Sequence, residues 1–370
     1  SSSAASDEYK RQGYSIRIGE YDRRLPSARL CPEVWLFASS PDVPDSSSDH
    51  DFGTGYRFPR LTTAEIVPLD VRSMRWDESK MGDQSGKVAV VTGSNTGIGY
   101  YMARALASKG ASVIMACRDP AKGEDARDRI LQEFPDSEVS VSVLDLADLS
   151  SIEEFASGFP SEGGLDILIN NAGVMIPPKS RTKDGFELQF GTNHLGHFAL
   201  TGRLLPILER TDGSRVVTVS SIAHNPGVID FEDLHGDRKR YNKWGFYSQS
   251  KIANLTFSLE LSRRLERAGS GVSAIASHPG YSATDLQRYS LFWRFLNVFV
   301  AMPAKKGAEA TLYAATEEGA LDHPYWGPTG IIEMRGATGK ARINRKARDE
   351  STASRLWEVS EELTGVRFLS

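Results

Sequence analysis

The chain has 370 residues, of which 40% are hydrophobic and 25% are charged, and its formal net charge is −4. This composition is ordinary for a soluble globular protein, and the acidic balance argues against a nucleic-acid binder, which needs a basic face. Two cysteines, Cys31 and Cys117, are too few for a disulfide framework, so we expect a reducing compartment, the cytoplasm. No apolar run reaches the length of about 18 residues that a membrane-spanning helix needs.

Residues 1–80 differ in composition from the rest of the chain. A polar, proline-containing stretch covers 39–49, and no apolar period is sustained in this part. Such a segment cannot bury enough apolar surface to offset the entropy lost on ordering. We therefore predict a largely disordered N-terminal extension over 1–80 and one folded domain over 81–370. Met74 and Met81 lie close to the start of that domain, so an over-extended reading frame is an open alternative.

From Gly86 onward, apolar segments typical of buried strands alternate with helical ones. Strands are predicted at 87–91, 111–117, 139–144, 165–169, 215–219 and 272–276, and helices at 98–107, 121–134, 149–156, 184–209, 244–267 and 349–364. The alternation predicts an α/β fold with a doubly wound parallel sheet of about seven strands and helices on both faces. Ligands of such sheets bind at the carboxyl ends of the strands.

The first strand runs into a glycine-rich turn that opens a helix. From Lys87 to Gly99 the sequence reads KVAVVTGSNTGIG. The N–H groups and the dipole at a helix N-terminus attract an anionic diphosphate, and glycine lets such a ligand approach the backbone closely. A purely structural turn is the alternative. The cofactor contacts predicted in this turn are Gly93, Ser94, Asn95, Thr96, Gly97, Ile98 and Gly99.

The end of the second strand bears on the choice between NAD and NADP. A site that prefers NAD usually offers a carboxylate there to the adenosine ribose, whereas this chain has Arg118. The planar guanidinium fork suits the oxygens of a 2′-phosphate. We therefore predict NADP(H) as the preferred cofactor. NAD(H) is the alternative, in which Arg118 is a solvated loop residue and Asp119 binds the ribose.

Tyr247 and Lys251 are the candidates for proton transfer. They lie four positions apart in a predicted helix and therefore share one face of it. A neighbouring ammonium and an oxidised nicotinamide would lower the pKa of the tyrosine, so that it can exchange a proton with an alcohol or carbonyl oxygen. Ser221, at the end of the fifth strand, is the candidate to hold that oxygen. Tyrosine and lysine at this spacing are also common surface residues, and the order of the surrounding motifs favours the catalytic interpretation.

Taken in order, these motifs resemble the short-chain dehydrogenase/reductase family. The matching patterns are TGxxxGxG at 92–99, NNAG at 170–173 and YxxxK at 247–251, and ACRD at 116–119, FGTNHLGHF at 190–198 and SSIAH at 220–224 resemble its branch of retinol dehydrogenases, WW-domain oxidoreductases and protochlorophyllide reductases. The resemblance extends from about Gly86 to Val366. It implies a Rossmann-like fold, a homodimer or homotetramer, and hydride transfer between NADP(H) and an alcohol/carbonyl pair.

The resemblance also implies roles for further residues. Asn193 is expected to lie in a distorted helix and to be linked through water to Lys251, and it completes the catalytic set with Ser221 and Tyr247. Tyr247 and Lys251 are counted among the cofactor contacts as well. The remaining expected cofactor contacts are Asp145, Leu146, Asn171, Ala172, Gly173, Pro279, Gly280 and Thr284. His194 and His197 have no third ligand at a suitable spacing, so we expect packing roles for them and no metal site.

The substrate is less well defined by the sequence. Apolar residues at 291–300 follow the Pro-Gly turn, where the family places its substrate lid. They suit a cover over a lipophilic substrate, a peripheral contact with a membrane, or ordinary core packing. We predict reduction of a hydrophobic aldehyde or ketone. The alternative is a non-catalytic protein on a dehydrogenase scaffold that senses cofactor or binds a partner, against which the intact Ser221, Tyr247 and Lys251 argue.

The interval between Ser221 and Tyr247 departs from the family pattern. At 26 positions it is longer than the resemblance implies. We therefore expect an insertion that borders the active site. Its apolar and aromatic residues are Phe231, Leu234, Tyr241 and Trp244.

Overall fold

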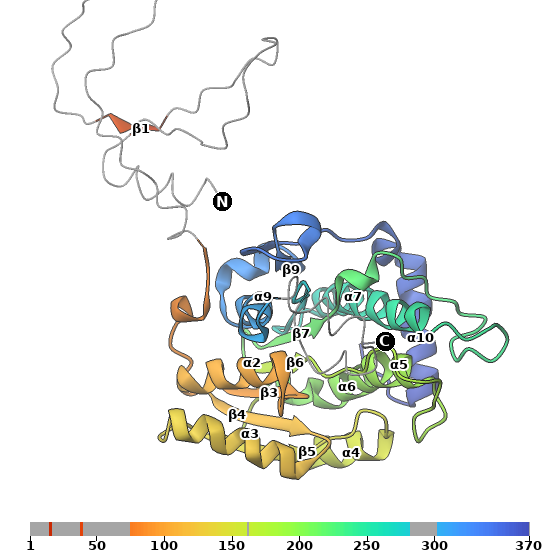
Figure 1. Cartoon of the computed structure of the whole chain (residues 1–370), viewed down its shortest axis with the longest axis horizontal. Coiled ribbons are helices and arrows are strands. Elements are labelled where there is room, and N and C mark those ends of the chain that lie inside the picture. The colour runs from red at the N-terminus through yellow and green to blue at the C-terminus, as the bar shows by residue number, and fades with distance from the viewer. Residues whose placement is uncertain (1–14, 17–37, 40–74, 161–162, 282–301, 370) are drawn as a thin grey trace, which may run out of the picture. The chain divides into compact units, whose positions relative to one another are not determined.

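The computed structural model describes residues 15–16, 38–39, 75–160, 163–281 and 302–369. The chain divides into two compact units, Ser1–Arg72 and Ser73–Ser370. In the first unit, β1 (Ser15–Ile16) pairs antiparallel with β2 (Ala38–Ser39). The second unit carries all the motifs singled out above, and it begins ahead of the boundary predicted at residue 81 (Figure 1).

A single sheet of eight strands organises the described part of the second unit, in the order β10-β9-β8-β7-β6-β3-β4-β5. Its strands are β3 (Val88–Thr92), β4 (Ser112–Cys117), β5 (Val139–Val143), β6 (Ile167–Asn170), β7 (Arg215–Val219), β8 (Ser273–Ser277), β9 (Tyr325–Pro328) and β10 (Thr338–Lys340). All neighbours are parallel except β9 and β10. The predicted doubly wound sheet is confirmed, with eight strands in place of about seven. Strands β9 and β10 were not predicted, because they are short and contain glycine or proline instead of an apolar run.

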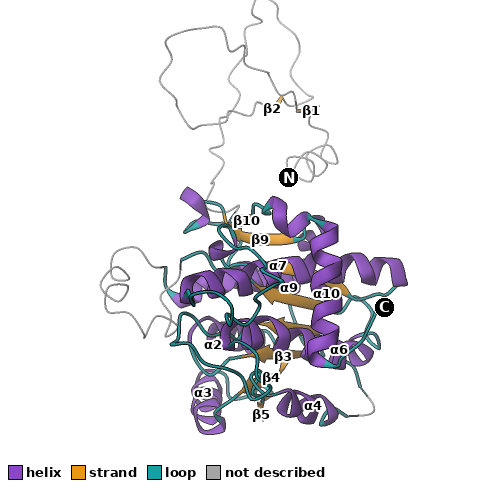
Figure 2. Cartoon of the chain, turned by 90° about the vertical axis from the view of Figure 1, so that its right-hand side faces the viewer, coloured by secondary structure: helices purple, strands orange, loops and turns teal. Residues whose placement is uncertain are grey.

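Helices cover both faces of this sheet, as the alternating pattern predicts. They are α2 (Gly97–Ser108), α3 (Pro120–Glu133), α4 (Leu149–Ser157), α5 (Leu188–Phe190), α6 (Gly196–Leu208), α7 (Lys243–Ala268), α9 (Ala304–Thr316) and α10 (Glu350–Thr364). Helices α2, α3 and α9 share one core cluster with strand residues such as Val91, while α4, α6 and α7 share the other with Val90. Figure 2 shows the strands between these two layers. Side chains alternate between the two faces along β3, so this strand contributes residues to both core clusters.

The predicted helix over 184–209 is interrupted. A π-helical turn, Gly191–Leu195, labelled η2, separates α5 from α6. A π turn inserts one extra backbone residue into a helix and is frequent at functional sites. Asn193 lies within it, so the helix distortion that the resemblance implies at this residue is present.

The C-terminal helix α10 packs on α6 and α7. Trp357 of α10 contacts Phe198 of α6 edge to face and stacks on Phe257 of α7, with ring centroids 5.1 and 5.8 Å away. Asp349 caps the helix by accepting the N–H of Thr352 at 2.8 Å. The helix predicted over 349–364 is therefore present, and it packs against the body of the fold.

The topology also defines where a ligand binds. From β3 the chain adds β4 and β5 on one side, then returns to place β6 on the other side of β3. The order of strands therefore reverses between β3 and β6, and ligands of open α/β sheets bind outside the carboxyl ends of the strands at such a point. No described helix is both long and apolar enough to cross a membrane.

Candidate active site

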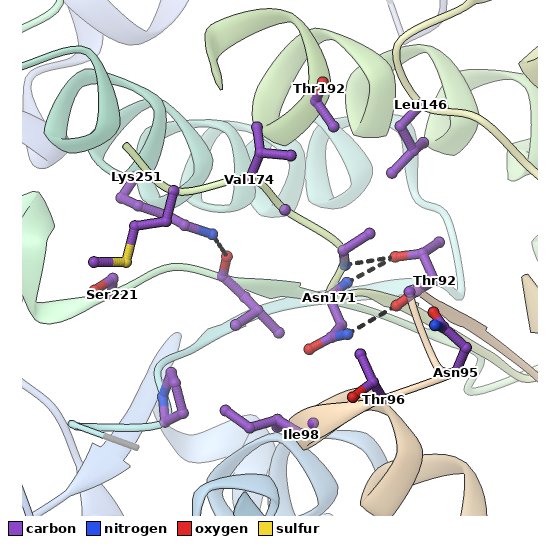
Figure 3. A pocket seen from close by; sticks show the side chains of 18 of the residues that line it. Thr92, Asn95, Thr96, Ile98, Leu146, Asn171, Val174, Thr192, Ser221 and Lys251 are labelled. Carbon is purple, nitrogen blue, oxygen red and sulfur yellow. Dashed lines mark hydrogen bonds between the residues drawn. The ribbon is translucent and has the colours of Figure 1, made fainter. Parts of the chain in front are cut away.

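A cavity of about 1320 Å³ opens at the carboxyl ends of the strands. It brings together predicted site residues that lie far apart in the sequence. The predicted site residues that line it are Gly93, Asn95, Thr96, Gly97, Ile98, Gly99, Arg118, Asp145, Leu146, Asn171, Ala172, Gly173, Ser221, Tyr247, Lys251, Pro279 and Gly280. Figure 3 shows Lys251 and Ser221 toward one end of this cavity and Asn95 and Thr96 toward the other.

Three predicted site residues are not among its lining. The Ser94 hydroxyl points into the interior, where it donates to the Val91 carbonyl at 2.9 Å, so it offers no side chain to the cavity. Asn193 is fully buried behind the lining. Thr284 lies outside the described residues, as does the apolar stretch at 291–300.

The glycine turn and the NNAG loop are joined by hydrogen bonds. The Thr92 hydroxyl accepts the N–H groups of Asn171 and Ala172, each at 2.9 Å, and the Asn171 amide donates to the Thr92 carbonyl at 2.8 Å (Figure 3). A Cβ at Gly99 would lie 2.5 Å from the Asn171 amide nitrogen, and Gly93 has a φ of +64°. These two glycines are therefore required by the close approach of the loops and by the backbone conformation.

This packing directs the start of α2 toward the cavity. Thr96 is the N-cap residue of the helix, and Gly97, Ile98 and Gly99 form its first turn and line the cavity. The first N–H groups of a helix have no partner within the helix. Together with the helix dipole they make this wall suitable for an anionic group such as a diphosphate.

One end of the cavity is rich in cations. Arg118, Lys122 and Arg129 line it together with two carboxylates, Asp119 and Asp125. Asp119 caps α3 by accepting the Lys122 N–H at 3.2 Å and also pairs with the Lys122 ammonium at 2.6 Å, and these hydrogen bonds hold the pKa of its carboxyl below the usual value. Arg129 stacks on the Tyr100 ring at 4.5 Å. Arg118 makes no hydrogen bond or ion pair with a described residue, so its guanidinium is available to a ligand.

The opposite end holds the serine, tyrosine and lysine. The Tyr247 hydroxyl is hydrogen-bonded to Ser221, and the Lys251 ammonium lies 6.0 Å from the centre of the Tyr247 ring. Lys251 donates to the Val219 carbonyl at 3.1 Å, while its own carbonyl accepts the Ser220 hydroxyl at 2.7 Å. The end of β7 is thus tied to α7, which sets the positions of all three side chains.

Burial shifts the pKa of both ionisable groups toward the neutral form. It raises the pKa of Tyr247 to about 12, although the hydrogen bond from Ser221 opposes this rise. It lowers the pKa of Lys251 to about 8. Tyr247 is therefore a protonated phenol at neutral pH, a state in which it can donate a proton.

Asn193 links two parts of the site without lining it. Its carboxamide accepts the Val174 N–H at 2.7 Å and donates to the Val174 carbonyl and the Ser250 hydroxyl, each at 2.9 Å. Val174 follows the NNAG loop directly, and Ser250 precedes Lys251 on α7. The π turn therefore places an amide where it connects the NNAG loop to α7.

The two histidines near Asn193 are interior residues. His194 contacts the Ser360 hydroxyl of α10 at 2.9 Å, and His197 contacts the Thr92 hydroxyl at 3.0 Å. Burial lowers the pKa of both, to about 3 and about 4. They are neutral groups that join helices to neighbouring elements, as the packing interpretation predicts.

Several residues near Ser221, Tyr247 and Lys251 were not predicted from the sequence. Apolar and aromatic side chains there come from four different loops and helices. They are Val174, Met175, Ile222, Ala223, Pro226, Tyr281 and Met334. Tyr281 follows the Pro-Gly turn directly and could have been found from that position, whereas Met334 comes from the β9–β10 loop and carries no sequence signal.

The insertion between Ser221 and Tyr247 borders the cavity only in part. Trp244 lines it, but Phe231, Leu234 and Tyr241 do not. Leu234 packs with the buried Phe190, and the Tyr241 hydroxyl donates to the buried Glu187 at 2.7 Å. Most of the insertion therefore packs beside the site in a small core cluster that it shares with Phe190 and Leu356.

Comparison with known proteins identifies the family. The model of the short chain dehydrogenase family matches residues 87–293. Human retinol dehydrogenase 12 is 46% identical over 290 residues, covering 76% of this chain and 88% of that protein. Human retinol dehydrogenase 11 is 44% identical over 288 residues, covering 76% and 86% respectively.

Solved structures agree with this assignment. An uncharacterized protein from Mycobacterium Paratuberculosis superposes with a TM-score of 0.68 at 46% identity, covering 80% of this chain and 99% of that one. The chain therefore belongs to the short-chain dehydrogenase family of nicotinamide-dependent oxidoreductases, in the branch that contains the retinol dehydrogenases.

Proposed function

We propose that this protein transfers a hydride between NADP(H) and a hydrophobic alcohol/carbonyl pair, with Tyr247 as the general acid and base. One observation carries this proposal: Ser221, Tyr247 and Lys251 meet at one end of a cavity whose other end presents the α2 N-terminus and Arg118. A dinucleotide has its reactive ring at one end and its adenosine at the other, so this arrangement of groups suits it.

The cavity residues fit the cofactor in chemistry as well as in order. Gly93 lines the cavity without a side chain, and the first turn of α2 offers N–H groups for the diphosphate. Asn95, Thr96, Asp145 and Asn171 supply polar side chains along the wall. When bound, the nicotinamide ring supplies or accepts the hydride.

The protein's own groups handle the substrate oxygen and its proton. The Ser221 hydroxyl holds the carbonyl oxygen, and Tyr247 gives that oxygen its phenolic proton as the carbonyl becomes an alcohol. In the oxidation direction the phenolate takes the proton back. The Lys251 ammonium stabilises the phenolate because it lies on the same helix face, one turn away.

The preference for NADP rests on the cations at the adenosine end. A 2′-phosphate is recognised by guanidinium and ammonium groups, and Arg118, Lys122 and Arg129 line this part of the cavity. Asp119 is the carboxylate that could otherwise bind the ribose of NAD, but it is occupied in capping α3 and pairing with Lys122.

The proposal of a hydrophobic substrate rests on the side chains that line the catalytic end of the cavity. Met175, Ile222, Trp244 and Met334 surround Tyr247 and Ser221 with mostly apolar surface, which favours an apolar ligand held at a few polar groups. Relatives named retinol dehydrogenase support the same class of substrate.

We also propose a homodimer or homotetramer in the cytoplasm, with a peripheral membrane contact at 291–300.

The experiment follows nicotinamide absorbance while NADPH or NADH is offered with aliphatic and aromatic aldehydes and ketones. We expect turnover of the hydrophobic members, with Tyr247→Phe slower by about a thousandfold because the proton donor is lost. Arg118→Ala should lower kcat/KM for NADPH about tenfold or more and leave NADH unaffected. Arg127→Ala is the matched control, since Arg127 lies on α3 but pairs with Glu124 and Asp128 away from the cavity.

The other outcomes are distinct. Turnover of small polar ketones alone would contradict the hydrophobic substrate. NADPH binding with no turnover across the panel would favour a cofactor sensor on this scaffold. Failure to bind either dinucleotide would overturn the proposal as a whole.

A further inference from the structure

His278 is a buried histidine that supports the turn beside the catalytic groups. It precedes Pro279 and Gly280, which line the cavity, and its side chain is fully buried. The ring Nδ1 accepts the Gly280 N–H at 3.2 Å. A neutral imidazole with an accepting Nδ1 carries its proton on Nε2, so the tautomer of His278 is set by the turn itself.

The Nε2 atom faces Glu333. The two atoms Nε2 and Oε2 are 3.4 Å apart, and the buried Nε2 has no hydrogen-bond partner among the described residues. The second carboxylate oxygen of Glu333 accepts the Arg342 N–H at 2.8 Å. Burial alone would raise the pKa of Glu333, but His278 and the Arg342 N–H outweigh it, so the pKa lies below its usual value and Glu333 is charged at neutral pH.

The loop that carries Glu333 closes over the same turn. Between β9 and β10, Ile332 and Glu333 have φ values of +53° and +57°, a region that non-glycine residues adopt only at an energetic cost. Met334, the next residue, accepts the Tyr281 N–H at 2.8 Å through its carbonyl and lines the cavity. The strained β9–β10 loop therefore contacts the segment 278–281 at two points, His278 and Tyr281.

Close packing leaves this segment little freedom. A Cβ at Gly280 would lie 2.5 Å from the Met334 carbonyl oxygen, and a Cβ at Gly327 of β9 would lie 2.0 Å from the His278 Nε2. The imidazole is therefore packed tightly against the β9 backbone. We expect packing of this kind to pass a change at Glu333 on to His278.

We propose that Glu333 is a positioning residue for the nicotinamide end of the site, acting through His278 on the Pro279–Gly280 turn. Glu333 does not line the cavity, so its effect reaches the cofactor only through other residues. This inference rests on the proposed function, since it requires a nicotinamide ring at that turn. We expect Glu333 to affect binding of the nicotinamide half of the cofactor and to leave binding of the adenosine half unchanged.

Two variants and a fragment of the cofactor test this. Glu333→Gln keeps the shape and removes the charge. His278→Asn keeps an acceptor for the Gly280 N–H and removes the group that faces Glu333. Glu153→Gln is the matched control, because Glu153 is an exposed carboxylate on α4 that pairs only with Arg203 among the described residues. For each protein we would measure Kd for NADPH and for 2′,5′-ADP, which lacks the nicotinamide, together with kcat and KM.

We expect Glu333→Gln to weaken NADPH binding and to lower kcat, each by about tenfold, since a charge-assisted contact is lost. The Kd for 2′,5′-ADP should stay unchanged. The double variant Glu333→Gln/His278→Asn should bind NADPH as well as His278→Asn alone, because both changes interrupt the same chain of contacts. Equal weakening of both ligands, additive effects, or wild-type behaviour of Glu333→Gln would each overturn the inference. Failure of the wild-type protein to bind NADPH would instead overturn the proposed function and, with it, this inference.

Discussion

At the scale of single residues, the site is governed by opposite pKa shifts in one buried pair. Burial favours the neutral form of each group, so Tyr247 is held protonated with a pKa of about 12 and Lys251 loses its proton above about pH 8. A protonated phenol suits reduction at neutral pH. In the proposed mechanism oxidation needs the phenolate, whose population grows with pH and is increased by a charged Lys251.

Replacing Lys251 with methionine should therefore separate the two directions. Without the ammonium the pKa of Tyr247 rises further, so the pH profile of alcohol oxidation should move upward by about one unit. Below about pH 8, where Lys251 carries its charge, this shift lowers the oxidation rate about tenfold. The rate of carbonyl reduction near pH 6.5 should fall by a smaller factor. The measurement is kcat/KM in both directions from pH 6 to 10, and Lys239→Met, at an exposed lysine paired with Asp230, is the control. A Lys251→Met profile that keeps its wild-type position would contradict this role.

At the scale of elements, the sequence predicted what periodicity and motif spacing control. The helix predicted over 244–267 is α7 at Lys243–Ala268, and six strands lie within a few residues of their predicted positions. The π turn in the helix predicted over 184–209 has no periodic signature, because it depends on Asn193 finding partners in Val174 and Ser250. The contribution of Met334 likewise depends on a long-range fold of the β9–β10 loop, which local sequence does not encode.

Asn193→Ala tests how far this π turn supports the site. The change removes three hydrogen bonds made by a fully buried side chain and leaves the Val174 N–H and carbonyl without their partner. We expect the free energy of unfolding to fall by about 2–4 kcal/mol. Urea unfolding at pH 7 measures this loss. Asn225→Ala, which removes one exposed hydrogen bond to Ile222, should stay within about 0.5 kcal/mol of wild type, and equal losses in the two variants would argue against a special role for the turn.

At the scale of the whole molecule, composition separated a first segment from a dehydrogenase fold but could not locate the boundary. Trp76 is an isolated aromatic in a polar stretch, so nothing in the local sequence assigns it to the fold. In the structure it is buried and meets the Tyr313 ring of α9 edge to face, with centroids 5.5 Å apart. Nearby, Glu78 pairs with Arg104 of α2 and Lys305 of α9 at 3.3 and 2.6 Å. Residues ahead of Met81 therefore fasten α2 to α9.

Two truncations measure what this segment contributes. A chain that begins at Ser73 keeps every contact of Trp76 and Glu78 described above, and it should fold and bind NADPH. A chain that begins at Met81 loses the buried indole, so its free energy of unfolding should be about 3 kcal/mol lower, whereas the partly exposed ion pairs add less than about 1 kcal/mol each. Urea unfolding of both chains gives the difference. Trp76→Ala in the longer chain should reproduce most of it, since the indole supplies the larger share. Equal stability of the two truncations would show that the fold is complete from Met81, and the boundary predicted from composition would then be the correct one.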